Sequence, residues 1–356
     1  MTIKVLVIDD SALMRGLLTE IIGGAADLQV VGAAPDAIAA REMIKTLDPD
    51  VLTLDVEMPK MDGLEFLSRL MRLRPMPVVM VSSHTERGSE ATLRALETGA
   101  VDFMAKPRFD IGDASAMHTY AEEIRDKIRA AHGARLRVAP RQTVATAVSP
   151  ALTHGGLSQK ILNGHIIAIG ASTGGTEAIK DVLSCLPAEM PGIVMVQHMP
   201  EAFTASFAKR LDSLSSLQVR EAQGGERIEP GTAWLAPGHS HLRVRKNGGG
   251  YVTELTHDEP VNRHRPAADV LFRSVAEQVR EGCATGVILT GMGKDGAQGL
   301  LEMKKAGDWN IGQDQESCVV YGMPREAAMV GAIDEVAPLS GIAGRILAHL
   351  RHMDRT

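Results

Sequence analysis

Ser172, His198 and Asp295 are residues of the types that serine hydrolases use, and each follows a short apolar run typical of a buried strand. A serine hydroxyl is a weak nucleophile until a base removes its proton, and a histidine base needs a carboxylate to fix its tautomer. Ser172 would be the nucleophile, His198 the base and Asp295 the carboxylate. Their types and positions therefore predict a serine hydrolase.

The turn that holds Ser172, Gly170–Gly175, has the pattern G-x-S-x-G between a strand-like and a helix-like segment. Such a turn exposes the serine at a helix N-terminus, where backbone N–H groups can stabilise an oxyanion. Glycines flank Met292, so its N–H could approach the oxyanion and is a candidate donor. A tight turn or a phosphate-binding turn also fits the pattern, although no lysine follows the glycines as in a P-loop.

Simpler explanations exist for the other two residues. His198 could be a loop histidine, and Asp295 could cap a helix. The order Ser, His, Asp also differs from the order Ser, Asp, His of α/β-hydrolases. This difference argues against that fold but not against a triad, because geometry and not chain order defines one.

A second group of chemically active residues lies in the first third of the chain. Asp9 and Asp10 follow the first expected strand, and Asp55 follows the third. Three neighbouring carboxylates repel one another unless a hard cation such as Mg²⁺ neutralises them. Ser82 and Lys106 end the fourth and fifth strands, where a hydroxyl and an ammonium suit a phosphoryl group. Asp55 would accept that group, although each acid taken alone could also cap a helix.

The elements that must position this second group alternate regularly. Apolar runs without polar alternation predict strands at Ile3–Ile8, Gln29–Gly32, Val51–Leu54, Val78–Val81 and Val101–Met104. Helical patterns lie between and after them, at Ala12–Ile22, Ala37–Leu47, Leu64–Leu73, Ser89–Thr98 and Ala121–Ala131. This alternation predicts an α/β fold with a doubly wound parallel sheet covered on both faces. The strand ends should converge at its topological switch point.

The remainder of the chain divides into a linker and a second α/β domain. Residues 133–159 are rich in Gly, Pro, Ser, Thr and Ala, which indicates a solvated linker. Strands are then expected at His165–Ile169, Gly192–Gln197, Gly231–Leu235 and Thr285–Thr290, helices at Thr176–Leu186, Ala205–Leu211 and Ala267–Arg280, and a hairpin about Gly248–Gly250. We therefore expect domains at residues 1–125 and 161–350, with a helix end and linker at 126–160.

Composition excludes several classes of function. A net charge of −6 and an aromatic content of 3% do not favour nucleic-acid binding. No run of about 18 apolar residues is present, so neither membrane insertion nor a signal peptide is expected. The three cysteines form no CxxC pair, which argues against a disulfide framework or a thiolate metal site. These features predict a cytoplasmic protein.

The first third of the chain resembles the response-regulator receiver family. The resemblance rests on V-L-V-I-D-D at 5–10, D-V-E-M-P-x-M-D-G-L from Asp55 and F-x-x-K-P at Phe103–Pro107. It implies that Asp55 is phosphorylated by a histidine kinase. It also implies that Mg²⁺ is held by Asp9, Asp10, Asp55 and the Glu57 carbonyl, and that Ser82 and Phe103 relay the change.

Residues from about 163 to 345 resemble the chemotaxis protein-glutamate methylesterases, the CheB family. The resemblance rests on I-G-A-S-T-G-G-T-E-A, V-Q-H-M-P, P-V-N-R-H-R-P and L-T-G-M-G-x-D-G. It implies hydrolysis of glutamate methyl esters on methyl-accepting chemoreceptors, deamidation of receptor glutamines by the same route, and no cofactor in the esterase site. The pair His239 and His241 has spacing that could bind a metal, but no acid or thiol lies nearby. Residues 263–265 could contact an acidic receptor helix or form a solvated loop.

Two other functions remain open from the residues alone. One is a response regulator without enzymatic activity, whose second domain binds DNA or a protein. No basic helix-turn-helix pattern supports it. The other is the same chemistry on a different acyl substrate, as in a glutaminase or a general esterase.

Overall fold

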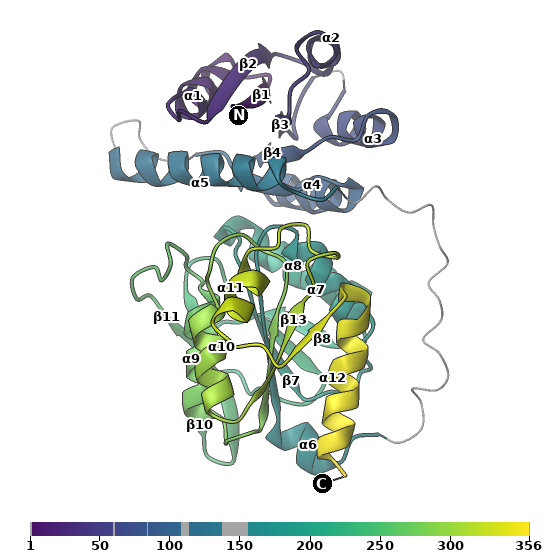
Figure 1. Ribbon diagram of the computed structural model, residues 1–356, viewed down its shortest axis with the longest axis vertical. Helices are drawn as coiled ribbons and strands as arrows, with labels where there is room; N and C mark the ends of the chain where they lie inside the picture. Colours follow the sequence, from purple (N-terminus) through teal and green to yellow (C-terminus); the bar gives the residue numbers. More distant parts are fainter. Residues whose placement is uncertain (1, 60, 84, 108–113, 137–155, 356) are drawn as a thin grey trace. The chain divides into compact units, whose positions relative to one another are not determined.

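The computed structural model describes residues 2–59, 61–83, 85–107, 114–136 and 156–355. The chain falls into two compact units, Met1–Arg141 and Gln142–Thr356, and each is described here by itself (Figure 1). Most of the expected linker, at 137–155, lies outside the described residues. The last helix of the first unit, α5 (Ala114–His132), continues past the expected boundary at residue 125.

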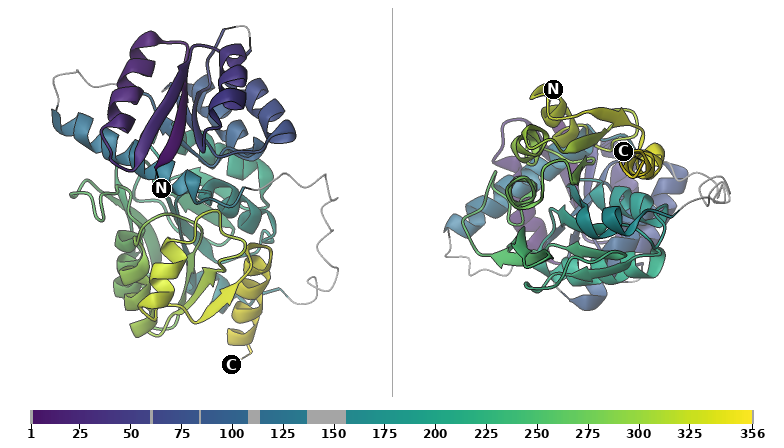
Figure 2. Two further views of the ribbon diagram at one scale, coloured as in Figure 1. Left: turned by 45° about the horizontal axis from the view of Figure 1, so that its top comes forward. Right: turned by 90° about the horizontal axis from the view of Figure 1, so that it is seen from below.

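The first unit is a five-stranded, fully parallel sheet with the strand order β2-β1-β3-β4-β5. Its strands are β1 (Ile3–Ile8), β2 (Leu28–Ala34), β3 (Val51–Asp55), β4 (Val78–Ser82) and β5 (Asp102–Ala105). The helices are α1 (Ala12–Gly23), α2 (Ala37–Leu47), α3 (Gly63–Leu73), α4 (Glu86–Thr98) and α5, and Figure 2 shows them on both faces of the sheet. The predicted doubly wound fold is confirmed.

Local sequence explains where these elements begin and why the strands are apolar throughout. All five residues of β3 are buried, and so are all five of β4, because helices cover both faces. The Asp36 carboxylate accepts the N–H groups of Ile38 and Ala39 and begins α2 at the predicted residue. The Thr85 hydroxyl accepts the Gly88 N–H at 2.9 Å, so α4 begins three residues before the predicted Ser89.

The second unit is built on a seven-stranded parallel sheet with the order β14-β13-β12-β6-β7-β9-β8. Its strands are β6 (Ile166–Ala171), β7 (Gly192–Gln197), β8 (Gln218–Glu221), β9 (Thr232–Leu235), β12 (Ala284–Ile288), β13 (Trp309–Gln313) and β14 (Glu335–Ala337). Its helices are α6 (Gln159–Gly164), α7 (Gly175–Ser184), α8 (Glu201–Leu214), α9 (Ala268–Gln278), α10 (Ala297–Lys305), α11 (Met323–Met329) and α12 (Leu339–Met353). The predicted parallel α/β architecture is confirmed.

A separate antiparallel hairpin joins β10 (His241–Asn247) to β11 (Gly250–Thr256), as the Gly248–Gly250 run predicts. The predicted strand Thr285–Thr290 extended too far, because β12 (Ala284–Ile288) ends at Ile288 and not at Thr290. The Thr290 N–H donates to the Gln313 side chain at 2.8 Å instead of a neighbouring strand. No helix in the described residues is long and apolar enough to cross a membrane.

Candidate functional site

Backbone hydrogen bonds fix the turn after β6 that holds Ser172. The Ser172 N–H donates to the Thr290 carbonyl at 3.1 Å, and the Gly175 N–H donates to the Ser172 carbonyl at 2.6 Å. Gly174 has a φ of 78°, a conformation that glycine adopts without steric cost, and α7 begins at the next residue. The turn therefore places Ser172 at the edge of the sheet, just before a helix N-terminus.

A buried glutamine links the turn at Ser172 to the residue after β7. Gln197 is the last residue of β7, and its Nε2 donates to the carbonyl oxygens of Ser172 at 2.9 Å and His198 at 3.1 Å. One side chain thus fixes the main chain of the expected nucleophile and of the expected base. Sequence reasoning missed Gln197 because it reads as an ordinary strand end.

His198 and Asp295 are in direct contact. The His198 Nε2 lies 2.8 Å from the Asp295 Oδ2, and both side chains are buried. The Asp295 carboxylate also accepts the N–H groups of Ala268 at 2.6 Å and Asp269 at 3.2 Å, and the Asn262 side-chain amide at 2.9 Å. Burial raises the pKa of Asp295, but its contact with His198 and these donors lower it to about 2. The carboxylate is therefore ionised at neutral pH.

The other ring nitrogen of His198 is available. Its Nδ1 is buried and has no hydrogen-bond partner among the described residues, and no hydrogen bond joins the ring to the Ser172 hydroxyl. The His264 ring stacks on the His198 ring, with centroids 3.8 Å apart and planes at 16°. His264 therefore does not lie in a free solvated loop. With Nε2 bonded to Asp295, only Nδ1 can take a proton from a nucleophile.

The loop after β12 approaches Ser172 closely. A Cβ atom placed on Gly291 would lie 2.8 Å from the Ser172 Cβ and 3.0 Å from its backbone nitrogen, so only glycine fits there. The Gly291 N–H donates to the Val320 carbonyl at 3.1 Å. Within the described second unit, the N–H of the next residue, Met292, donates to no acceptor. The geometry therefore leaves this N–H available as an oxyanion donor.

A second buried acid supports Asp295 through a shared amide. The Asn262 Nδ2 lies 2.9 Å from both Asp269 Oδ2 and Asp295 Oδ1, and Asp269 Oδ1 accepts the Gly299 N–H at 2.7 Å. Burial raises the pKa of Asp269, and the nearby charge of Asp295 adds to this shift. Sequence reasoning assigned no role to Asn262 or Asp269. The signal that could have found Asn262 is its place in the segment P-V-N-R-H-R-P.

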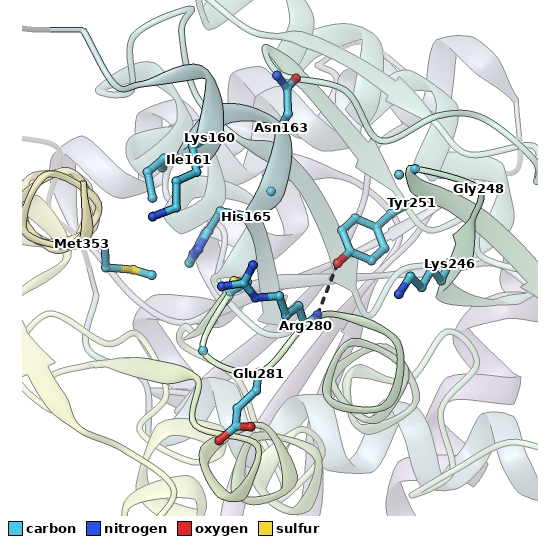
Figure 3. A pocket seen from close by; sticks show the side chains of 15 residues that line it. Lys160, Ile161, Asn163, His165, Lys246, Gly248, Tyr251, Arg280, Glu281 and Met353 are labelled. Atoms are coloured by element: carbon cyan, nitrogen blue, oxygen red, sulfur yellow. Dashed lines mark hydrogen bonds between the residues drawn. The ribbon is translucent and has the colours of Figure 1, made fainter. Parts of the chain in front are cut away.

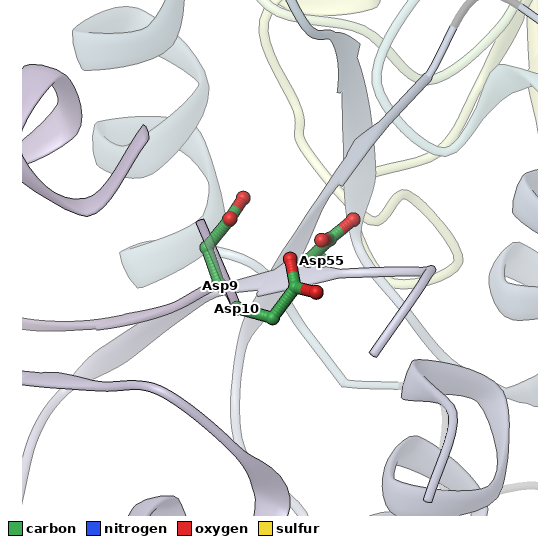
Figure 4. Close-up of side chains that lie close together, drawn as sticks. All are labelled: Asp9, Asp10 and Asp55. Carbon is green, nitrogen blue, oxygen red and sulfur yellow. The ribbon is translucent and has the colours of Figure 1, made fainter. Parts of the chain in front are cut away.

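The three acids expected in the first unit lie together. One carboxylate oxygen from each of Asp9, Asp10 and Asp55 falls within 4.8 Å of the others, and Figure 4 shows the three side chains side by side. The Lys106 Nζ lies 2.7 Å from Asp55 Oδ2 and 3.0 Å from Asp9 Oδ2. Asp9 and Asp55 are buried, and Asp10 is exposed. Three carboxylates face one ammonium, an excess of negative charge that suits a hard divalent cation.

Asp55 is strongly perturbed. Burial raises its pKa to about 6, and the Asp9 charge adds to the rise, while the Lys106 hydrogen bond opposes it. The Glu57 N–H donates to Asp55 Oδ1 at 3.2 Å. An oxygen-rich, partly buried cluster of this kind fits Mg²⁺, which would neutralise the acids.

The Ser82 and Phe103 side chains contact groups other than these three carboxylates. The Ser82 hydroxyl donates to the Gly88 carbonyl in α4 at 3.2 Å. Phe103 is buried, and the Lys127 ammonium lies 5.8 Å from its ring centroid. Ser82 therefore connects the end of β4 to α4.

The His239 and His241 pair does not form a metal site in the described residues. The His241 Nδ1 accepts the Ala267 N–H at 3.2 Å, and its Nε2 donates to the Glu259 carbonyl at 3.1 Å. The His239 Nδ1 instead lies 3.5 Å from the Glu201 Oε1. Both nitrogens of His241 are used, so the pair cannot chelate a cation.

Comparison with known families matches both units. The CheB methylesterase family profile matches residues 167–346, and the response regulator receiver domain profile matches residues 5–114. A protein-glutamate methylesterase/protein-glutamine glutaminase of Nitrosomonas europaea is 61% identical over 352 residues, 98% of this chain and 96% of the relative. A protein of Dechloromonas aromatica with the same name, numbered 1, is 62% identical over 97% of each chain.

A solved structure agrees with the second unit. The crystal structure of the Thermotoga maritima CheB methylesterase catalytic domain has a TM-score of 0.51 and is 40% identical. The match covers 52% of this chain and 98% of that domain. The similarity therefore extends over almost the whole of that catalytic domain.

Proposed function

Because this chain belongs to the CheB methylesterase family and carries a response-regulator receiver domain, we propose that Ser172, His198 and Asp295 are its catalytic residues. The protein is a protein-glutamate methylesterase and protein-glutamine glutaminase of chemotaxis, regulated through its receiver. The methyl esters are on glutamates of methyl-accepting chemoreceptors, and the glutamines are on the same receptors. We assign the receiver to residues 1–125, the helix end and linker to 126–160 and the catalytic domain to 161–350.

Acylation starts at the free nitrogen of His198. Its Nδ1 takes the Ser172 hydroxyl proton while Oγ attacks the ester carbonyl carbon, and the carbonyl electron pair moves to oxygen. The Met292 N–H donates to this oxyanion. The ionised Asp295, 2.8 Å from Nε2, stabilises the imidazolium that forms. The imidazolium then protonates the leaving methoxide oxygen, and methanol departs from the acyl-enzyme.

Deacylation uses the same groups with water as the nucleophile. His198 removes a proton from water, the hydroxide attacks the acyl carbon, and the Ser172 oxygen leaves with the proton from the imidazolium. Glutamate is the product. For a glutamine substrate the first leaving group is ammonia, and the remaining steps do not change. The ring geometry of His198, with Nε2 on Asp295 and a buried, unpaired Nδ1, carries this proposal.

Labelling with a sulfonyl fluoride tests the nucleophile directly. The full-length protein should acquire one adduct on Ser172, found by peptide mass spectrometry, and lose methanol release in step with labelling. Ser172→Ala should lose both. Ser184→Ala is the matched control, because Ser184 ends the same helix, α7, and is exposed. Labelling at another serine with equal loss of activity would refute the assignment.

The receiver site is proposed to take a phosphoryl group from a histidine kinase. The Asp55 carboxylate attacks the phosphorus, and the bond to the histidine nitrogen breaks, with its electron pair remaining on that nitrogen. Asp9, Asp10, Asp55 and the Glu57 carbonyl would hold Mg²⁺, which neutralises charge on the acids and the phosphoryl oxygens. Lys106 would then bind a phosphoryl oxygen, and Ser82 and Phe103 would relay the change. Phosphorylation measured with and without Mg²⁺ tests this set.

A further inference from the structure

The catalytic domain has a cavity at the edge of its sheet opposite to Ser172. Its volume is about 400 Å³, and it lies where β6 and β12 begin, between the β10–β11 turn and the end of α12. Ser172 follows the other end of β6, and a strand of six residues spans roughly 20 Å. The cavity is therefore separate from the active site.

Unpaired positive charge surrounds this cavity. Lys160, Lys246 and Arg280 line it, and none of them has a carboxylate oxygen within 4.0 Å among the described residues. Several other cations of this domain are paired, as Lys304 is with Asp334 at 2.9 Å. Figure 3 shows the side chains of Lys160 and Arg280 pointing to one region, while the only lining acid, Glu281, points away. The side chains that line the cavity thus carry three positive charges and one negative charge.

A buried histidine adds an unused polar atom at the same place. His165 lines the cavity and is 2% exposed, and Figure 3 shows its ring beside Lys160 and Arg280. Its Nε2 lies 2.9 Å from the Thr285 hydroxyl, but its Nδ1 has no hydrogen-bond partner among the described residues. Buried polar atoms are normally hydrogen-bonded, so an unpaired one at a cavity indicates a missing partner.

The state of His165 suits an anion. Burial lowers its pKa to about 3, so the ring is neutral and carries one N–H. When the Thr285 hydroxyl donates to Nε2, that N–H is on Nδ1 and can donate to a ligand. Two cations and one N–H then face the same region, which is the donor set for a dianion with at least three oxygens. A phosphate group meets this description better than a carboxylate, which has two oxygens and one charge.

We propose that this cavity binds a small phosphate-bearing ligand, with its phosphate on Lys160, Arg280 and His165 Nδ1. The volume exceeds that of phosphate alone, so the rest of the ligand has room beside Tyr251 and Met353. Lys246 lies beyond Tyr251 in Figure 3 and is placed to bind a second anionic group.

Calorimetric titration of the full-length protein with inorganic phosphate and with pyrophosphate tests the proposal. Magnesium-free buffer and a Lys106→Ala background exclude binding at the receiver. In this background, the protein with an unchanged cavity should bind both probes at millimolar concentration or below. It should bind pyrophosphate more tightly than phosphate. Lys160→Gln and Arg280→Gln should each weaken binding by about tenfold or more. Lys209→Gln, an exposed lysine on α8, is the matched control and should bind as the wild type does.

His165 distinguishes a built site from a general charge effect. In His165→Asn the amide nitrogen can replace Nδ1 as donor and should preserve binding, whereas His165→Leu removes the donor and should weaken it. Methanol release should remain unchanged in Lys160→Gln and Arg280→Gln, because neither residue touches the active site. The proposal is overturned if neither probe binds, or if the two cavity variants bind as tightly as the Lys209 control.

Discussion

Replacing Asp295 with asparagine exchanges one carboxylate oxygen for an NH₂ group in a site where every neighbour donates. At Oδ2 the neighbours are the His198 ring and the Ala268 N–H, at 2.8 and 2.6 Å. At Oδ1 they are the Asn262 amide and the Asp269 N–H, at 2.9 and 3.2 Å. The new amide must turn its NH₂ toward one of these two pairs.

The orientation of the amide depends on how many hydrogen-bond donors its NH₂ group would face. With its NH₂ at the Oδ1 position, the new amide opposes two donors, the Asn262 amide and the Asp269 N–H. Asn262 cannot rotate its amide to relieve this conflict, because its oxygen would then face the Asp269 carboxylate. With NH₂ at Oδ2 it opposes one fixed donor, Ala268, because a neutral His198 can change tautomer. The ring then carries its proton on Nδ1 and cannot accept one from Ser172. A wrong tautomer of this kind lowers kcat by about 10⁴ in serine proteases, which corresponds to about 5 kcal/mol.

Methanol release from methylated chemoreceptor membranes measures this loss as kcat/KM. Asp308→Asn is the matched control, because Asp308 is also buried in this domain and also accepts a backbone N–H, that of Ala284 at 3.0 Å. Asp308→Asn should keep wild-type activity, and both variants should show a cooperative thermal transition. A folded Asp295→Asn protein with a rate within tenfold of wild type would refute the assignment of Asp295 to the base.

Four further predictions concern the other residues of the two sites and the buried Asp308. Ser172→Ala and His198→Ala should each lower methanol release by several orders of magnitude, and the double variant should lose little more, because the residues act as a unit. Asp55→Asn should abolish stimulation by a phosphodonor and leave basal release intact, and a full response in that variant would place the acceptor elsewhere. His264→Ala should slow release about fivefold, from the loss of about 1 kcal/mol of ring stacking, while His264→Phe should retain most activity. Burial raises the pKa of Asp308 from 3.8 to about 7, so its protonated form is favoured in the folded state. The contribution of Asp308 to stability should therefore be greatest below about pH 4 and should fall by at most about 1.4 kcal/mol per pH unit up to about pH 7. Urea melts at pH 5 and 8 should then show a smaller fall in stability for Asp308→Asn than for the wild type.

The sequence was sufficient for the elements that are long, apolar and bounded by caps. β1, β7 and α2 have the predicted limits, because continuous apolar runs or a capping aspartate define them. β13 and β14 were not predicted from the sequence. β13 reads W-N-I-G-Q, and its Asn310 is buried only because its amide donates to the Leu300 and Ala332 carbonyls. That partnership is tertiary and leaves no periodic signal.

For the candidate catalytic site, too, some features can be predicted from the sequence and others depend on tertiary structure. A serine, a histidine and an aspartate after three strands can be found from residue type and position, because parallel strands end at one edge. The groups that donate to Asp295, from Asn262, Ala268 and Asp269, cannot be found in this way. Two of them are backbone N–H groups, which nearly every residue carries. The stacking of His264 on His198 depends on how the segment before α9 folds back, which no local pattern encodes.

Strand order explains why each domain has its chemistry at one point. In the receiver the order reverses between β1 and β3, and Asp9, Asp10 and Asp55 follow those two strands. In the catalytic domain it reverses between β6 and β12, which Ser172 and the Gly291–Asp295 loop follow. Successive connections leave such a point in opposite directions and open a crevice there. The segment with Asn262 and His264 reaches the catalytic crevice from the hairpin β10–β11, which is not part of that sheet. A rule based on strand ends therefore locates the reacting groups but misses the segment that orients them.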